Sequence, residues 1–282
     1  MLFECGEGTQ RQMMRYGVSF ALSEIFFTHF HADHFLGVIG LIRTLGLQGR
    51  PEPLFLYGPK GARKVLTTAM QLGVDRLPFP IEIVEVKAGD TIGGEGGRGK
   101  RDGYDIWAFP TEHGGGPSIG YVLKEHVRRG RFDVEKARGL GIPEGPLWGK
   151  LTKGEEVQLS DGQTVRPSDL VGPPRPGRLV AFTGDTRPCA ATVDAAQGAD
   201  LLIHEATFGE EERERARDTG HATAQEAAQV ALAAKAKRLV LSHVSARYSI
   251  SADELVREAR EVFPNVSVAK DGLEVEVPFP ES

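Results

Sequence analysis

The chain has few cysteines and no long hydrophobic run. Cys5 and Cys189 are the only two cysteines among 282 residues, which is too few for a disulfide framework or a cysteine-rich zinc module. No apolar run is long enough to span a membrane, and the first residues lack the charged and apolar regions of a signal peptide. We therefore expect a soluble protein of the reducing cytoplasm, with no membrane partner.

An excess of positive charge is also absent. The formal net charge is −5, which argues against a surface that is positive throughout but leaves room for a local basic patch. Glycine is abundant, with 35 residues. Hydrophobic residues make up 40% of the chain and charged residues 26%, and both shares are ordinary for a globular protein. This composition is typical of an ordered, turn-rich protein, and the length suits one large domain or two small ones.

Short β-type runs and helical patterns are mixed along the chain, which indicates an α/β protein. Two predicted helices begin with capping boxes, at Thr223-Ala-Gln-Glu226 and at Ser251-Ala-Asp-Glu254. The strands are numerous enough for two sheets face to face with helices outside, so we predict an αββα sandwich. The predicted strands are 22–28, 54–57, 81–86, 104–109, 120–123, 178–183, 200–204, 238–242, 266–269 and 273–277, and the predicted helices are 35–47, 61–72, 190–196, 224–236 and 252–263.

Two segments do not follow this pattern. Residues 93–103 are rich in glycine and are predicted to form a flexible loop, whereas residues 126–177 have few apolar runs and are interpreted as an excursion from the core. Between 124 and 153 there are eight basic and four acidic residues, a local charge of +4 on a chain whose remainder carries −9. Such a segment is either a solvated loop or a basic arm that grips a phosphate backbone.

The strongest chemical signal is a cluster of metal-ligand side chains between a predicted strand and a predicted helix. His29, His31, Asp33 and His34 lie within six residues. Imidazole nitrogens and carboxylate oxygens are ligands that zinc accepts. His29 and His31 can project to one side of an extended segment, leaving Asp33 and His34 to face a neighbouring point. The spacing therefore predicts two metal ions side by side.

Three more polar residues, His113, Asp185 and His243, each follow a predicted strand. Loops at strand ends are where an α/β sandwich places its functional side chains. Together with the first cluster they supply the seven ligands of a binuclear site.

These ligands resemble the pattern of the metallo-β-lactamase superfamily, whose fold is the αββα sandwich. Further motifs, spread over almost the whole chain, resemble the ribonuclease Z family of tRNA 3′-end processing endonucleases. They are Cys5-Gly-Glu-Gly-Thr-Gln10, Gly141-Ile-Pro-Glu-Gly-Pro146, Thr183-Gly-Asp-Thr-Arg187, His204-Glu-Ala-Thr-Phe208, Gly220-His-Ala-Thr223 and Ser245-Ala-Arg-Tyr248.

The resemblance implies one metallo-β-lactamase-fold domain over residues 1–282, with residues 124–177 as an inserted tRNA-binding arm whose tip holds Gly145 and Pro146. It implies two zinc ions per subunit, and the nitrogen and oxygen ligands also accept manganese. A homodimer is implied as well, because in the family the arm serves the partner subunit's active site. The implied ligands are His29, His31 and His113 for one ion, Asp33, His34 and His243 for the other, and Asp185 as the bridge.

The implied reaction is metal-hydroxide attack on the phosphodiester after the discriminator nucleotide of precursor tRNA, which leaves a 3′-hydroxyl on the tRNA. Asp33 is the implied proton acceptor for the attacking water, and Glu205 and His221 are the implied pair that protonates the leaving 3′-oxygen. Arg247 and Tyr248 are implied contacts to the scissile phosphate or a terminal base.

Two other interpretations compete with this one. The same metals would serve a small-molecule phosphodiesterase of the superfamily that does not use tRNA. Alternatively, the chain is a non-catalytic fragment, because Met1 to Glu4 resemble the end of a strand and the strand pair that the family normally carries before the Cys-Gly-Glu-Gly turn is absent. Glu4 also stands where the family usually has Asp, and Ala246 replaces a common Ser.

Overall fold

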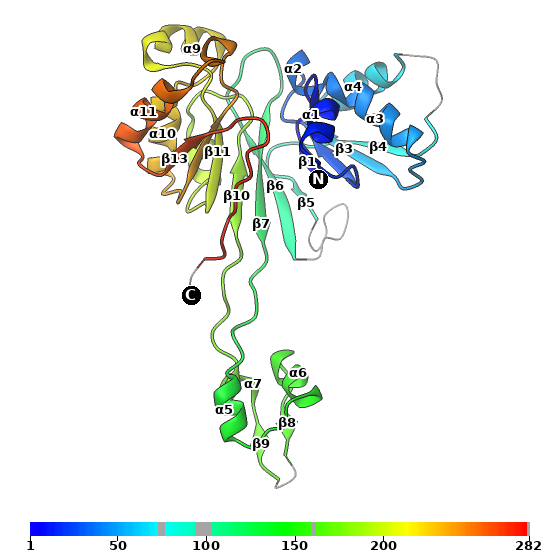
Figure 1. Ribbon diagram of the computed structural model, residues 1–282, viewed down its shortest axis with the longest axis vertical. Helices are drawn as coiled ribbons and strands as arrows, with labels where there is room; N and C mark the ends of the chain where they lie inside the picture. Colours follow the sequence, from blue (N-terminus) through cyan, green and yellow to red (C-terminus); the bar gives the residue numbers. More distant parts are fainter. Residues whose placement is uncertain (73–76, 94–102, 160–161, 281–282) are drawn as a thin grey trace. The chain divides into compact units, whose positions relative to one another are not determined.

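The computed structural model describes residues 1–72, 77–93, 103–159 and 162–280. The chain divides into two compact units (Figure 1). The first unit comprises Met1–Lys124 and Leu179–Val277, and the second comprises Glu125–Arg178 and Pro278–Ser282.

The first unit contains two β-sheets. The strands of one sheet are β1 (Leu2–Phe3), β2 (Glu24–Phe26), β3 (Leu54–Gly58) and β4 (Ile81–Glu85), all parallel and in this spatial order. The strands of the other are β5 (Thr91–Ile92), β6 (Tyr104–Pro110), β7 (Ile119–Glu125), β10 (Leu179–Phe182), β11 (Leu201–Glu205), β12 (Leu239–Ser242) and β13 (Val266–Val268). Their spatial order is β13-β12-β11-β10-β7-β6-β5. The four strands from β10 to β13 are parallel, and β7 is antiparallel to β10.

Helices cover the outer face of each sheet (Figure 1). Those of the N-terminal half are α1 (Thr9–Arg15), α2 (Ala32–Phe35), α3 (Gly37–Leu47) and α4 (Ala62–Met70). Those of the C-terminal half are α8 (Ala190–Ala195), α9 (Arg213–Thr219), α10 (Ala224–Ala233) and α11 (Asp253–Val262), with short 3-10 turns η1 (Glu210–Glu212) and η2 (Ala246–Tyr248).

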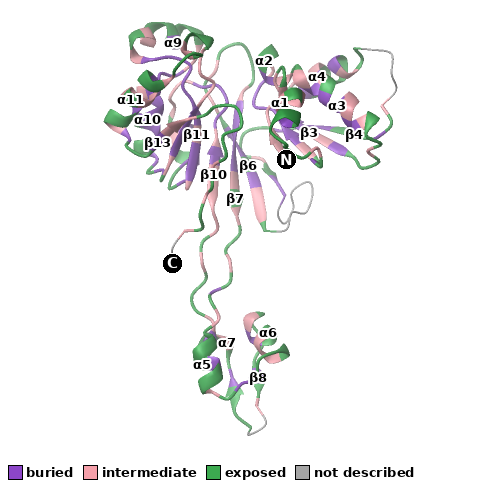
Figure 2. Ribbon diagram, viewed as in Figure 1, coloured by how far each residue is buried: buried purple, intermediate pink, exposed green. Residues whose placement is uncertain are grey.

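Alternation along the strands divides the apolar side chains between layers. Leu54 and Leu56 of β3 pack in the core that includes Leu41 of α3, whereas Tyr57 packs in the core between the two sheets with Ile106 of β6. Successive side chains of a strand point to opposite faces, so one apolar strand contributes to two cores at once. Burial is concentrated in these strands (Figure 2).

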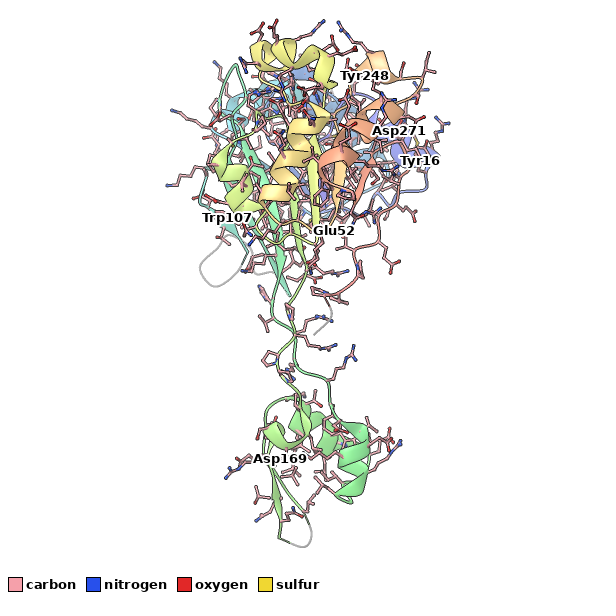
Figure 3. The ribbon with its side chains drawn as sticks, turned by 90° about the vertical axis from the view of Figure 1, so that its left-hand side faces the viewer. Tyr16, Glu52, Trp107, Asp169, Tyr248 and Asp271 are labelled. Atoms are coloured by element: carbon pink, nitrogen blue, oxygen red, sulfur yellow. The ribbon has the colours of Figure 1, made fainter. Side chains whose placement is uncertain are left out.

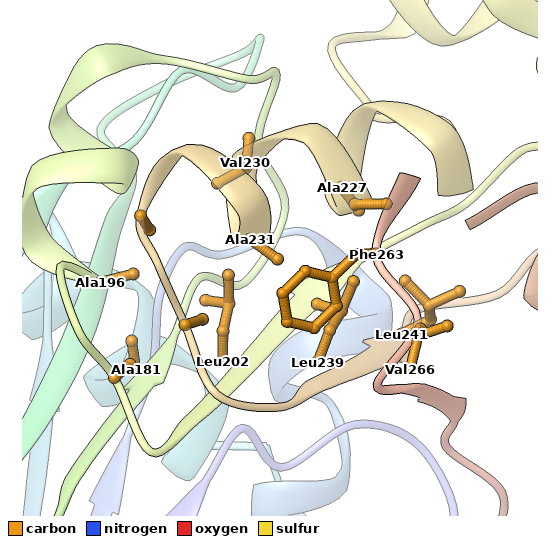
Figure 4. Packing of buried hydrophobic residues seen from close by; sticks show 14 of the residues in the cluster. Ala181, Ala196, Leu202, Ala227, Val230, Ala231, Leu239, Leu241, Phe263 and Val266 are labelled. Atoms are coloured by element: carbon orange, nitrogen blue, oxygen red, sulfur yellow. The ribbon is translucent and has the colours of Figure 1, made fainter. Parts of the chain in front are cut away.

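A third core lies beneath the C-terminal helices (Figure 4). Leu202, Leu239 and Leu241 of the sheet pack there with Ala227 and Ala231 of α10. Alanines keep α10 close to the strands because their side chains are small. Three apolar layers between four layers of secondary structure make the αββα metallo-β-lactamase fold, and the predicted fold class is confirmed.

Most predicted elements are present with shifted ends, and two predictions are wrong. Residues 273–277 alternate like a strand, but they form none because no described neighbour supplies a hydrogen-bonded ladder. The capping box that starts at Thr223 is confirmed, because Thr223 Oγ1 accepts from Glu226 N and Glu226 Oε2 accepts from Thr223 N. The one predicted at Ser251 is wrong: α11 begins one residue later than that box requires, and Ser251 Oγ accepts from Asp253 N at 3.1 Å.

The predicted glycine-rich loop at 93–103 lies outside the described residues except for its two ends. Among the described residues, no helix has both the length and the apolar character needed to cross a bilayer.

The second unit consists of a stalk and a head. In the stalk, residues 125–131 and 172–178 run antiparallel, with Arg128 N donating to Arg175 O and Arg175 N to Arg128 O. The head, residues 132–171, contains α5 (Val134–Gly139), α6 (Pro146–Thr152), β8 (Val157–Gln158), β9 (Thr164–Val165) and α7 (Pro167–Leu170). Asp169, labelled in Figure 3, accepts from Arg166 N at the start of α7. The head has a small apolar core that the sequence pattern does not predict, made by Ala137, Ile142, Leu151, Val157, Val165 and Leu170.

Candidate metal centre

The seven predicted ligands come together beyond the carboxyl ends of strands from both sheets. His29 follows β2, and His31 is the N-cap of α2. Asp33 and His34 lie in the single turn of α2. The remaining three ligands, His113, Asp185 and His243, follow β6, β10 and β12.

The ligand atoms form two groups that meet at one carboxylate. One group is His29, His31, His113 and Asp185, and within it the ligand atoms all lie within 4.8 Å of one another. The same limit holds for the second group, Asp33, His34 and His243. Oδ2 of Asp185 lies 3.7 Å from His29 Nε2 and 3.9 Å from His113 Nε2 in the first group. It also lies 3.3 Å from His34 Nε2 and 3.4 Å from His243 Nε2 in the second, so Asp185 stands between the two groups.

Local backbone geometry explains why these residues can meet. Gly184 has a φ of +61°, and a Cβ at this position would lie 2.3 Å from Thr28 Oγ1. Only glycine therefore lets the chain turn here and bring Asp185 against the loop after β2. His243 has a φ of +53°, a conformation that costs a non-glycine residue about 1–3 kcal/mol and that clusters at functional sites.

Two buried atoms of the seven predicted ligands have no hydrogen-bond partner among the described residues. They are His29 Nε2 and Asp185 Oδ1. Buried polar atoms normally have a partner, so an unpaired nitrogen and an unpaired carboxylate oxygen in one ligand group need an explanation. A divalent cation fits, because both atoms are electron-pair donors and the surrounding donors are of the types that zinc and manganese accept.

Three of the imidazoles are oriented by contacts on Nδ1, the ring nitrogen opposite the one that faces the centre. His29 Nδ1 lies 3.0 Å from Thr28 Oγ1, and His113 Nδ1 lies 2.8 Å from the Gly220 carbonyl oxygen. His243 Nδ1 lies 2.9 Å from Thr207 Oγ1. Such partners fix the ring and leave the opposite nitrogen for a metal. The sequence patterns do not predict these supporting contacts, although Thr207 belongs to the His204-Glu-Ala-Thr-Phe208 motif.

Burial and neighbouring charges perturb the proton affinities of the centre. Burial, assisted by nearby imidazoles, lowers the pKa of His29 to about 3, which keeps its ring neutral and its lone pair available. Burial opposes protonation of His34 as well, but Asp185 and Glu4 outweigh it and raise the pKa of His34 to about 10. For Asp185, burial favours the neutral acid, yet His34 and the other imidazoles lower its pKa and hold it ionised.

Beside the candidate metal ligands lies a second chemical group, the pair Glu205 and His221. Glu205 is fully buried, and its Oε1 lies 2.9 Å from His221 Nδ1. The carboxylate also accepts from Thr186 N, Thr207 Oγ1 and Ala222 N, so its position is fixed from several sides. Burial alone would lower the pKa of His221, but the carboxylate of Glu205 raises it.

The other predicted site residues do not join the cluster. Arg247 pairs with Glu212. Tyr248, labelled in Figure 3, accepts from Gly209 N at 2.9 Å through its hydroxyl. Gly145 and Pro146 are exposed in the head, where they are the N-cap and first residue of α6.

A cavity of about 170 Å³ adjoins the first ligand group. His29, His31 and His113 line it together with Phe30 and Lys60. The cavity therefore opens onto the centre, with Phe30 and Lys60 in its wall.

Comparisons with known proteins agree with this geometry. The family model described as "Beta-lactamase superfamily domain" matches residues 1–132 and 159–244. A ribonuclease Z of Gemmatimonas aurantiaca is 54% identical over the whole chain, which covers 88% of that protein. One of Myxococcus xanthus is 52% identical over 99% of the chain and 89% of its own length.

Among solved structures, human tRNase Z, short form, is similar with a TM-score of 0.66 and 27% sequence identity. The likeness covers 98% of this chain and 88% of the human one. The chain belongs to the ribonuclease Z family of the metallo-β-lactamase superfamily.

Proposed function

We propose that the protein is a metal-dependent endoribonuclease that removes the 3′ trailer of precursor tRNA by cutting after the discriminator nucleotide. The relatives named ribonuclease Z and tRNase Z supply the substrate class. The observation that carries the proposal is the pair of ligand groups sharing Asp185, with the Glu205 and His221 pair beside it. This combination serves phosphodiester hydrolysis, because both the phosphate charge and the leaving oxygen need stabilisation.

Two zinc ions per subunit are the proposed cofactors, with manganese as an alternative. His29, His31 and His113 would hold one ion, Asp33, His34 and His243 the other, and Asp185 would contact both. Bound cations of this kind lower the pKa of a water molecule and neutralise phosphate oxygens.

The side chains of the protein then handle the protons. Asp33 has a side chain that is 65% exposed, and its Oδ2 lies 3.3 Å from His243 Nε2, so it can orient a water molecule and accept its proton. As the water oxygen bonds to phosphorus, the bond between phosphorus and the 3′-oxygen of the tRNA breaks, and that oxygen takes the electron pair. We assign the proton that it needs to His221, whose Nδ1 is held by Glu205 and whose Nε2 is the donor.

The second unit is the proposed tRNA-binding arm. Arg129, Arg131, Lys136, Lys150 and Lys153 are exposed on it, and cations of this kind bind a phosphate backbone with a strong dependence on salt. Gly145 and Pro146 lie at the exposed start of α6, and we propose that this end of the head contacts the tRNA. Arg247 and Tyr248 remain proposed substrate contacts, although each also has a partner within the protein.

We further propose a homodimer in which each arm serves the site of the partner subunit, as in the family. The proposed compartment is the cytoplasm, where the free thiols of Cys5 and Cys189 would stay reduced.

The alternative function is hydrolysis of small phosphodiesters without tRNA. To separate the two, we would replace the head (132–171) with a short Gly-Ser linker and load both proteins with zinc. The proposal predicts that the intact protein releases the trailer from a precursor tRNA. It also predicts that the headless protein loses most of this activity but still hydrolyses bis(p-nitrophenyl) phosphate. An intact protein that hydrolyses only the small ester would support the alternative.

A further inference from the structure

Arg187 lies two residues after Asp185, at a point where three loops of the centre meet. Its backbone N–H donates to the Glu112 carbonyl oxygen at 2.7 Å, directly before the metal-ligand candidate His113. Its guanidinium Nη1 donates to the His221 carbonyl oxygen at 2.5 Å. One residue therefore connects the loops that carry His113, Asp185 and His221.

The guanidinium is itself held by a carboxylate at the start of α10. Nη1 donates to Oε2 of Glu226 at 2.7 Å, and Nη2 donates to Oε1 at 2.5 Å. Glu226 also accepts from Thr223 N in the capping box, and its side chain is 10% exposed. A two-pronged contact of this type fixes direction as well as distance, because both terminal nitrogens of the planar guanidinium donate to the same carboxylate. Glu226 at the start of α10 thus anchors Arg187, and Arg187 in turn holds the loop of Gly220 and His221 that precedes this helix.

The loop that Arg187 holds has two contacts with the centre. Gly220 presents its carbonyl oxygen to His113 Nδ1 at 2.8 Å, and His221 presents its ring to Glu205. The Arg187 to His221 contact lies on the main chain of the very residue whose side chain is the proposed proton donor. A shift of this carbonyl would move the imidazole of His221 relative to Asp185, whose Oδ2 lies 3.8 Å from His221 Nδ1.

We propose that Arg187 is a positioning residue for His221: anchored on Glu226, it holds the His221 main chain so that the imidazole can reach the leaving 3′-oxygen. This inference rests on the proposed function. Arg187 ends the Thr183-Gly-Asp-Thr-Arg187 motif, and its side-chain contacts assign it a role that acts through the main chain of His221.

The test uses a leaving group that needs no proton. Two precursor tRNAs are compared, one with the natural 3′-oxygen at the scissile linkage and one with a 3′-bridging sulfur, whose thiolate leaves without protonation. The variants are Arg187→Met, His221→Ala and the double variant, with Arg257→Met as the control. Arg257 contacts Glu254 on α11, both side chains are exposed, and neither residue belongs to the site.

The proposal predicts that Arg187→Met lowers the single-turnover rate on the oxygen substrate by about 10- to 100-fold, less than the full loss of a general acid of about 100- to 10,000-fold, because His221 is still present. The KM for the precursor should change little, and most of the loss should disappear on the sulfur substrate. In the His221→Ala background, Arg187→Met should cost almost nothing further, because two residues acting through one group are not additive. Arg257→Met should match the parent protein.

Bound metal is measured in every variant by atomic emission. Equal loss of rate on the two substrates, full additivity in the double variant, or loss of metal from Arg187→Met would each overturn the proposal and make Arg187 a support of the fold or of the metal ligands. If Arg187→Met does not fold, Arg187→Lys takes its place, and the same sulfur rescue of a smaller defect is expected. Failure of the proposed function is distinguishable, because the parent protein would then cleave neither tRNA.

Discussion

Nδ1 of His221 lies 2.9 Å from Oε1 of Glu205, a carboxylate with no exposed surface. This contact raises the pKa of His221 against the effect of burial, so the imidazole holds its proton to higher pH. A general acid is active only while protonated, and the rate should therefore fall as the pH rises through this pKa.

Glu205→Gln should change both the rate and its pH dependence. The amide keeps the shape of the side chain but loses the charge that favours the imidazolium, so the pKa of His221 should fall. We expect kcat to drop by about 100-fold and its alkaline limb to move to lower pH. A pH-rate profile on precursor tRNA measures both effects. Loss of rate with an unmoved alkaline limb would remove His221 from the role of proton donor.

Asp185→Asn should disrupt both ligand groups together. Even residues that only support metal ligands change affinity by about 10- to 100-fold, so loss of a carboxylate shared by both groups should weaken zinc binding at least that much. Zinc at 100 times its Kd should stabilise the parent protein by about 2.7 kcal/mol and stabilise this variant far less. Asp218→Asn is the control, because Asp218 is exposed on α9. Equal thermal shifts with zinc in all three proteins would contradict the assignment.

Arm function in the partner subunit can be tested by mixing two inactive proteins. One lacks the head but keeps the metal centre, and the other keeps the head but carries Asp185→Asn. In a homodimer whose arms serve the opposite site, a mixed dimer contains one complete combination, and cleavage of precursor tRNA should reappear after subunit exchange. The expected recovery is a sizeable fraction of the activity of one site. No recovery, despite mixed dimers detected by mass spectrometry, would show that each arm serves its own subunit.

Phe279 should stabilise the base of the arm. Its ring centre lies 3.5 Å from the guanidinium carbon of Arg128 and 4.2 Å from that of Arg178. Arg178 in turn makes a two-pronged contact with Glu125. Phe279→Ala should make tryptic cleavage in the stalk roughly two- to fivefold faster through loss of these cation–π contacts, and Phe279→Tyr should preserve them. The KM for precursor tRNA should rise while hydrolysis of the small ester stays the same. Unchanged cleavage of the stalk would rule out this role.

The clustering of the seven candidate metal ligands could be predicted because their signal is local. Four of them lie within six residues, and the others directly follow apolar strands. The αββα layers could be predicted for the same reason, since strand and helix periodicities are readable over short windows. Helix α1 was not predictable in this way, because it has a single buried residue, Met13, and no apolar stripe.

The supporting contacts could not be predicted because they join loops far apart in the chain. Gly220 meets His113 across 107 residues, and Arg187 meets Glu226 across 39. A backbone carbonyl such as that of Gly220 carries no sequence signature at all. The head of the arm was missed for a different reason, since its helices and strands are short and its core is small.

The most direct test of the function is the fate of the water oxygen. Zinc-loaded protein is incubated in H₂¹⁸O with a precursor tRNA that carries a 3′ trailer, and both products are analysed by mass spectrometry. We predict a tRNA that ends in a 3′-hydroxyl at the discriminator nucleotide and a trailer whose 5′-phosphate contains one ¹⁸O atom. A 3′-phosphate or cyclic phosphate on the tRNA, label on the tRNA, or no cleavage at all would contradict the account.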